Sequence, residues 1–199
     1  MTTFMFPSIT PASTSFELVT NSKTFRSPLT NSVQTSGRKG SLWKVSMSFK
    51  NLHGSERAEM QAFLTKLNGQ EHRFYLHDHS FVRRGIGGGT ISVRGGGQTG
   101  STLEVDGASF SVTNYLRAGD YVAFNNELHM VTADCDSNGL GYVSISIAPP
   151  IRKPTIDNNL VDYDVPVFGV FMLASKSGWT NDTAGLSSFS IEAVEDVLA

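Results

Sequence analysis

The chain has little of the chemistry from which enzymes, metalloproteins and nucleic-acid-binding proteins build recognisable motifs. Its 199 residues include one cysteine and only 17% charged residues, and the formal net charge is -2. A single Cys135 excludes an intrachain disulfide framework and is consistent with assembly in a reducing cytoplasm. The weak negative charge supplies no basic footprint for nucleic acid, so we expect no sequence-specific DNA or RNA binding.

Long apolar segments are also missing. No run of residues approaches the roughly 20 apolar positions that a membrane span needs. The N-terminal residues 1–7 lack the charged region and the long apolar region of a signal peptide. We therefore expect neither membrane insertion nor secretion by a signal peptide.

What remains is typical of a mainly β protein, with many Ser, Thr and Asn residues and 19 glycines for turns. Residues 8–40 predict an extended arm with one or two edge strands. Residues 42–49 alternate, with Trp43 and Phe49 among the apolar positions, which predicts a half-buried strand. The one predicted helix, residues 56–67, carries apolar residues at positions i, i+3, i+4 and i+7, with Ser55 as its N-cap and Gly69 as its stop.

The glycine-rich stretch 83–89 predicts a domain boundary. It follows an expected strand at 73–82, and five or six short strands come after it, up to a predicted end at Pro149-Pro150. Strands at 161–173 and 186–197 then need partners in the N-terminal segment. We predict that residues 1–83 and 151–199 form one discontinuous β domain, a sandwich or split barrel with one helix. Residues 84–150 form an inserted small β-barrel, reached through a flexible passage at the glycines.

Two glycine clusters invite a nucleotide-binding interpretation. Residues 95–100 match G-x-G-x-x-G, but the residues that follow them predict a strand, whereas a dinucleotide site needs a helix there. No G-K-[ST] sequence follows either cluster, so a P-loop is absent as well. We therefore expect no cofactor.

Histidines offer the best candidates for a metal site. His77 and His79 share one face of the strand expected at 73–82, near His72, and a third ligand would have to come from His53 or His129. The competing interpretation is a set of polar residues on an exposed strand or at a subunit contact. It is favoured, because two histidines without a closed ligand set are a weak signal.

No side chains are placed by their spacing in a catalytic role. The pairs Asp134 and Asp136, and Asp162 and Asp164, are expected on solvated strand faces. Cys135 is interpreted as a small residue at a strand end rather than a nucleophile. No G-x-S-x-G elbow anchors a Ser-His-Asp arrangement. We expect no catalytic residues, and thus no enzyme.

The order of these elements nevertheless resembles a known family. The Ser/Thr-rich arm, the strand Leu42–Phe49, the helix and Phe74-Tyr75-Leu76 look like the N-terminal half of distal tail proteins of long-tailed bacteriophages. The segments 116–122, 128–132 and 139–152 are similar to a pattern in phage tail-tip proteins, as is the ending at 189–195.

The resemblance implies a virion structural protein at the distal end of the tail, assembled in the cytoplasm of the bacterial host. Distal tail proteins form a hexameric ring between the tail tube and the baseplate hub or tail tip, and DNA passes through the lumen. One subgroup carries a barrel of the oligonucleotide/oligosaccharide-binding (OB) type outside the ring, which implies an OB-like barrel at 84–150. The alternative is a tail-tip adhesion module that binds host-surface carbohydrate or another protein. A tail-tube protein would also form hexamers.

Overall fold

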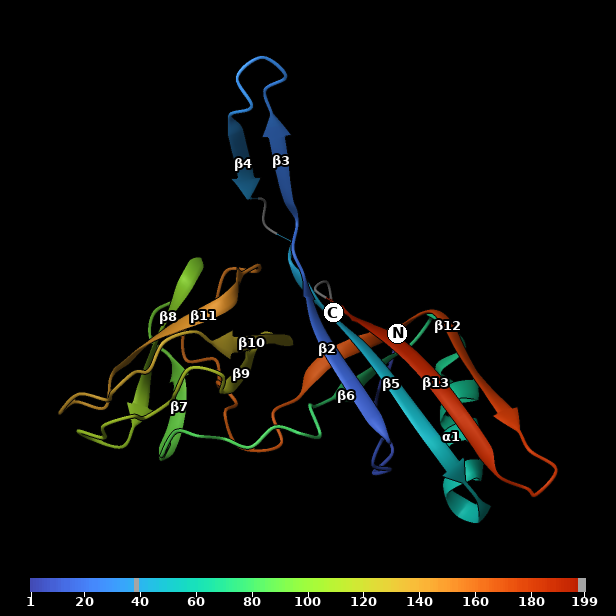
Figure 1. The fold of residues 1–199 in the computed structure, drawn as a ribbon. Helices are drawn as coiled ribbons and strands as arrows, with labels where there is room; N and C mark the ends of the chain where they lie inside the picture. Colours follow the sequence, from blue (N-terminus) through green and yellow to red (C-terminus); the bar gives the residue numbers. More distant parts are fainter. Residues whose placement is uncertain (38–39, 197–199) are drawn as a thin grey trace.

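The computed structural model describes residues 1–37 and 40–196, without the side chains of residues 175 and 176. Within these residues the chain forms thirteen strands and one helix, so the predicted mainly β fold is confirmed. The strands build a six-stranded sheet, a five-stranded sheet and a separate two-stranded hairpin (Figure 1). No helix in this part of the chain has the length and apolar content that a membrane crossing requires.

Strands from both ends of the chain form the six-stranded sheet, in the order β1-β6-β12-β13-β5-β2. All neighbouring pairs are antiparallel except β1 and β6. The C-terminal strands thus pair with N-terminal strands, as predicted, and the predicted sandwich or split barrel takes the form of this sheet with a helix against it. The strands are β1 (Thr3–Met5), β2 (Ser13–Val19), β5 (Leu42–Leu52), β6 (Arg73–Leu76), β12 (Gly169–Asn181) and β13 (Ser187–Glu195).

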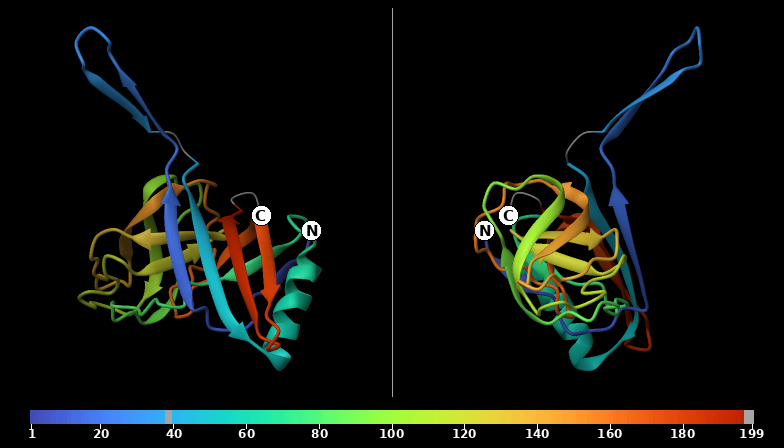
Figure 2. Two further views of the ribbon diagram at one scale, coloured as in Figure 1. Left: turned by 45° about the vertical axis from the view of Figure 1, so that its right-hand side comes forward. Right: turned by 90° about the vertical axis from the view of Figure 1, so that its left-hand side faces the viewer.

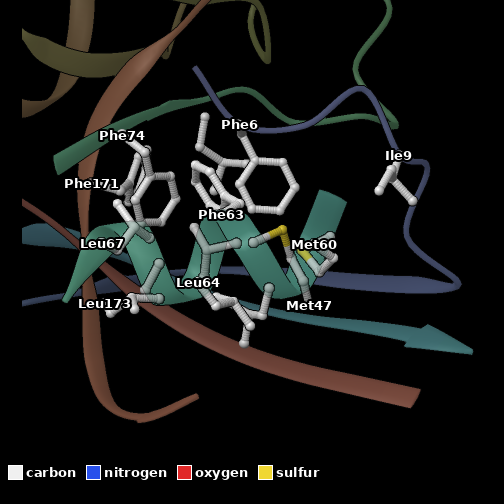
Figure 3. Packing of buried hydrophobic residues seen from close by; sticks show 14 of the residues in the cluster. Phe6, Ile9, Met47, Met60, Phe63, Leu64, Leu67, Phe74, Phe171 and Leu173 are labelled. Atoms are coloured by element: carbon white, nitrogen blue, oxygen red, sulfur yellow. The ribbon is translucent and has the colours of Figure 1, made fainter. Parts of the chain in front are cut away.

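The helix α1 (Gly54–Leu67) packs its apolar stripe against this sheet (Figure 3). Its buried residue Phe63 lies between the rings of Phe6 and Phe74, with ring centroids 5.2 and 5.7 Å apart. The predicted N-cap Ser55 is wrong by two positions, since His53 is the N-cap and makes no side-chain cap bond. The helix ends at Leu67, as predicted, with Asn68 as the C-cap at φ 48°. Gly69 follows with φ 68°, the left-handed conformation in which a glycine stops a helix.

The five-stranded sheet has the order β7-β8-β11-β10-β9 and curls into a half-barrel. β9, β10 and β11 are consecutive antiparallel neighbours, and the earlier strand β8 lies beside β11. This is a Greek-key arrangement. A second cluster of buried hydrophobic side chains forms the core of this half-barrel. The strands are β7 (Gly89–Val93), β8 (Gly100–Ala108), β9 (Tyr121–Phe124), β10 (Glu127–Val131) and β11 (Val143–Ile151).

Several strand limits differ from the predictions. β6 stops at Leu76 rather than at residue 82, and β12 starts at Gly169 rather than at 161. β11 does not end at Pro149-Pro150 but continues through both prolines to Ile151. The register of β11 against β8 shifts between Ser146 and Ile151, and this irregularity accommodates prolines that have no N–H for a regular ladder.

The two buried clusters do not divide the chain at residues 84 and 150. Val161 and Tyr163, beyond the predicted insert, belong to the core of the five-stranded sheet. Tyr121, Ala123 and Leu128, within the insert, belong to the core beneath the six-stranded sheet. The domain division therefore stays a prediction, and its C-terminal limit is better drawn after Tyr163.

Candidate functional site

The predicted metal candidates come together as a pair without a third ligand. His77 and His79 follow the end of β6, and their ring centroids are 4.3 Å apart, with Phe168 edge-on to His77 at 5.1 Å. Burial lowers the pKa of both imidazoles, and the charge of His79 lowers the pKa of His77 further. No group of three or more His, Cys, Asp or Glu side chains in the described chain could hold a metal ion. His53 caps α1 and His129 is buried elsewhere.

The other predicted side chains serve local structure. The ring of His72 packs edge-on against Phe4. Asp134 and Asp136 accept backbone N–H bonds of 2.9 and 2.6 Å from the loop at residues 114–118. Burial raises the pKa of the Cys135 thiol, which makes it a poorer nucleophile.

The G-x-G-x-x-G sequence forms the loop between β7 and β8. The side-chain amide of Gln98 bonds the carbonyl oxygens of Arg94 and Glu104, at 3.0 Å each, and fills this loop from within. β8 begins at Gly100, so a strand follows the glycines as predicted. The loop has no helix N-terminus to face a pyrophosphate.

A buried ion pair joins the two large sheets. Arg152, just after β11, donates hydrogen bonds of 2.7 Å to each carboxylate oxygen of Glu195 on β13. The same carboxylate accepts the backbone N–H groups of Trp43 at 3.1 Å and Leu128 at 2.8 Å. The indole N–H of Trp43 in turn bonds the carbonyl oxygen of Leu128 at 2.9 Å. These bonds fix the half-barrel against the six-stranded sheet.

A second buried carboxylate continues this network. Glu127 accepts the backbone N–H groups of Arg152 and Lys153 and lies 3.3 Å from Nε2 of His129. Burial raises the pKa of Glu127, but the His129 bond and the Arg152 charge outweigh it and hold that pKa below its usual value. The imidazole of His129 stacks on Phe124, with centroids 4.6 Å apart. The junction is thus a largely buried polar cluster with most of its groups bonded.

The glycine-rich passage between the sheets is held in place rather than flexible. The carboxylate of Asp120, fully buried, accepts the backbone N–H groups of Arg84, Gly85 and Arg117 at 2.7, 2.9 and 2.8 Å. A Cβ at Gly85 would lie 2.5 Å from the carbonyl oxygen of Tyr115. The glycine is therefore needed for close packing, and the prediction of a flexible passage is wrong.

The arm at residues 22–37 is the most exposed part of the described chain. Strands β3 (Ser22–Arg26) and β4 (Val33–Gly37) pair only with each other and stand clear of both sheets in all views (Figures 1 and 2). Every residue of both strands is exposed. Three apolar side chains on the hairpin have large exposed fractions, Phe25 at 60%, Leu29 at 95% and Val33 at 54%. An isolated two-stranded hairpin is marginally stable in water, and this one pairs with neither large sheet of the described chain.

A cleft of about 720 Å³ lies where the half-barrel meets the β1-β6-β12 edge of the six-stranded sheet. Its lining combines aromatic rings with amide and carboxylate side chains. The segment after β11 contributes two side chains of opposite charge, Lys153 and Asp162. Burial raises the pKa of the Asp162 carboxyl. Aromatic, amide and carboxylate side chains of the lining include those of Tyr75, Phe168, Asn125, Asn126, Asn159 and Asp162.

Sequence reasoning missed the junction, although one signal pointed to it. Glu195 continues the alternation Phe189, Ile191, Ala193 on the inward face of β13, where a charge needs a buried partner. Nothing in the sequence indicates that Arg152 is that partner, 43 residues away. The cleft has no local signature at all, because its lining comes from segments far apart in the sequence, at residues 5, 75, 123–126 and 153–170.

No known protein-family model matches the chain, and neither does any curated protein.

Proposed function

We propose that this chain is a virion structural protein, a distal tail protein of a long-tailed phage. In this proposal six subunits close into a ring that connects the tail tube to the tail-tip or baseplate hub. The protein acts by its geometry and not by catalysis, and DNA passes through the lumen without being recognised. The formal net charge of -2 suits that role, because a basic lumen would retain DNA through its phosphates.

The observation that carries the proposal is the projecting hairpin β3-β4. Its exposed apolar residues Phe25, Leu29 and Val33 lie away from both buried clusters, so they gain nothing from the fold of their own subunit. Packing on a neighbouring copy would bury them. A hairpin that reaches to the next copy makes a head-to-tail contact, and such contacts close into rings when the rotation permits.

The edges of the six-stranded sheet support the same assembly. β2 and β1 are its outermost strands, and each leaves one row of backbone N–H and C=O groups without a strand partner among the described residues. Exposed strand edges favour pairing with another chain. A closed ring would cover such edges without open-ended growth.

The test is the mass of the assembled particle. Native mass spectrometry and negative-stain images of the purified chain are expected to give six subunits and six-fold annuli. A stable monomer at high concentration would refute the ring. Six-subunit particles that stack into long tubes would instead favour a tail-tube protein.

Variants of the hairpin sharpen this test. Replacing residues 22–37 by a short Gly-Ser linker is expected to leave the thermal unfolding of the subunit nearly unchanged and to abolish the ring. Phe25→Asp is expected to weaken ring assembly as well. Phe110→Asp is the matched control, since Phe110 is 71% exposed but lies on the half-barrel. Equal loss of assembly in both point variants would remove the hairpin from the interface.

The second candidate function, binding of host-surface carbohydrate, is favoured by the cleft beside the half-barrel. It is compatible with a ring, because six copies would present six clefts.

A further inference from the structure

We infer that the cleft between the half-barrel and the β1-β6-β12 edge is a binding site for a neutral saccharide. The proposed site does not depend on ring formation, since a single subunit supplies its lining residues. Three features of the cleft indicate a neutral saccharide: its polar groups, its aromatic rings and its charge.

Amide side chains dominate the polar part of the lining. Asn125, Asn126 and Asn159 each carry two N–H donors and an acceptor oxygen, and Asp162 adds carboxylate acceptors. Sugar hydroxyls are donors and acceptors at once, so this set matches them better than it matches a purely anionic or purely cationic ligand. Asn159 is already oriented by a 2.6 Å bond from its Nδ2 to Oδ1 of Asn125.

Two aromatic rings provide the apolar part. Tyr75 and Phe168 line the cleft from the six-stranded-sheet side and are only half-buried, so part of each ring remains accessible. Phe124, the third ring, is buried and stacked on His129 and therefore serves the core. An accessible aromatic ring packs against the C–H face of a pyranose, and a mostly apolar pocket with a few placed polar groups is typical of small-ligand sites.

The charge of the cleft argues against phosphate or nucleic acid. Lys153 and Asp162 have opposite charges, and no arginine is among the described residues that line the cleft. Phosphate recognition instead uses clustered cations, above all bidentate arginine. A neutral ligand fits this balance.

The turn between β9 and β10 supplies a further indication. Asn125 and Asn126 have φ values of 53° and 64°, the left-handed conformation of a two-residue hairpin turn. Glycine is strongly preferred at the second position of such turns. Asparagine also tolerates this conformation, and Asn126, in place of glycine, adds an exposed side-chain amide to the lining of the cleft.

The frame around the cleft is rigid. The backbone of Asp162 forms two hydrogen bonds with the backbone of Ala123, of 2.7 and 2.8 Å. Lys153 directly follows Arg152, which forms the buried ion pair with Glu195. Preorganised groups lose less conformational entropy when they bind a ligand. The site therefore needs no closure to form.

The experiment uses the full chain on an array of neutral and anionic bacterial-surface oligosaccharides, followed by calorimetric titration of the strongest neutral oligosaccharide. We expect retention of neutral oligosaccharides. Asn126→Gly and Tyr75→Leu should each weaken binding about tenfold, the scale of a lost hydrogen bond or ring contact. Asn126→Gly keeps the turn conformation, so its thermal midpoint should not fall.

Asn158→Gly is the matched control. Asn158 also has a positive φ, 61°, but lies outside the cleft lining. It should bind like the unmodified chain. Absence of any retained glycan, retention of anionic glycans alone, or equal affinity of Asn126→Gly and the unmodified chain would each overturn the inference. Particle mass measured on the same samples separates this result from that of the ring test.

Discussion

Arg152 and Glu195 form a two-bond ion pair, 2.7 Å at each bond, that ties the end of β11 to β13. Only 6% of the Arg152 side chain and none of the Glu195 side chain is exposed. The half-barrel is therefore fastened to the six-stranded sheet in one orientation. A cleft along that junction keeps its shape for the same reason.

Removing one partner of this pair should be strongly destabilising. Arg152→Met leaves the Glu195 carboxylate buried without its cation, and we expect a loss of about 3–5 kcal/mol in the free energy of unfolding. Urea denaturation measures it. Lys44→Met is the control, because the Lys44–Glu192 pair, 3.4 Å apart, is about 40% exposed and should contribute at most about 1 kcal/mol. Similar losses in the two variants would contradict a special role for the buried pair.

The adjacent histidines His77 and His79 should make stability depend on pH below the usual histidine pKa of 6.5. Their folded-state pKa values are lowered, mainly by burial, so the unfolded chain binds protons first as the pH falls. The free energy of unfolding is then undiminished by this pair above pH 6.5 and decreases below it.

The variant His77→Gln should reduce this decrease between pH 7 and pH 5, measured by urea unfolding at each pH. His79→Gln should reduce the decrease in the same direction, because burial lowers the pKa of His79 as well. An identical slope in His77→Gln and the unmodified chain would show that the pair does not titrate in this way.

The passage between the sheets should tolerate no side chain at Gly85. In Gly85→Ala the new Cβ meets the Tyr115 carbonyl oxygen at 2.5 Å and the Leu116 Cα at 2.6 Å, so the backbone must shift. We expect a loss of about 1–3 kcal/mol, read from chemical denaturation. Gly178→Ala is the control, since nothing lies within 4 Å of its Cβ position. A neutral Gly85→Ala would mean that the passage yields easily.

Removal of the half-barrel should leave a folded remainder only if the excised segment extends to Tyr163 rather than to residue 150. Replacing residues 84–163 by a short linker removes the second core whole, and the 2.6 Å ion pair between Arg83 and Asp164 shows that the two ends meet. We expect cooperative thermal unfolding at a lowered midpoint, because Tyr121 and Leu128 also leave the first core.

Excision of residues 86–149 only should give an aggregating product, since Val161 and Tyr163 lose the core that buries them. Circular dichroism and size-exclusion chromatography compare the two products. If the shorter excision folds and the longer one does not, the original limit at residue 150 is correct.

Local patterns predicted most strands and the helix because they depend on neighbours in sequence. The alternation of Trp43, Val45, Met47 and Phe49 and the helical spacing of Met60 to Leu67 both correspond to buried positions. The ends of elements were less predictable. The strand expected at 73–82 stops at Leu76, the last residue of β6 that pairs with β12.

The sequence by itself determined the mainly β class, the single helix and the pairing need of the C-terminal strands, because hydrophobic periodicity acts over a few residues. Only the tertiary structure decided that Glu195 meets Arg152, that Asp120 holds Arg84 and Gly85, and that four distant segments enclose one cleft. Such contacts depend on how sheets pack in space, which the order of residues along the chain does not reveal locally. The hairpin at 22–37 combines the two. Its polar composition predicted an arm, and the tertiary structure shows that this arm pairs with neither large sheet of the described chain.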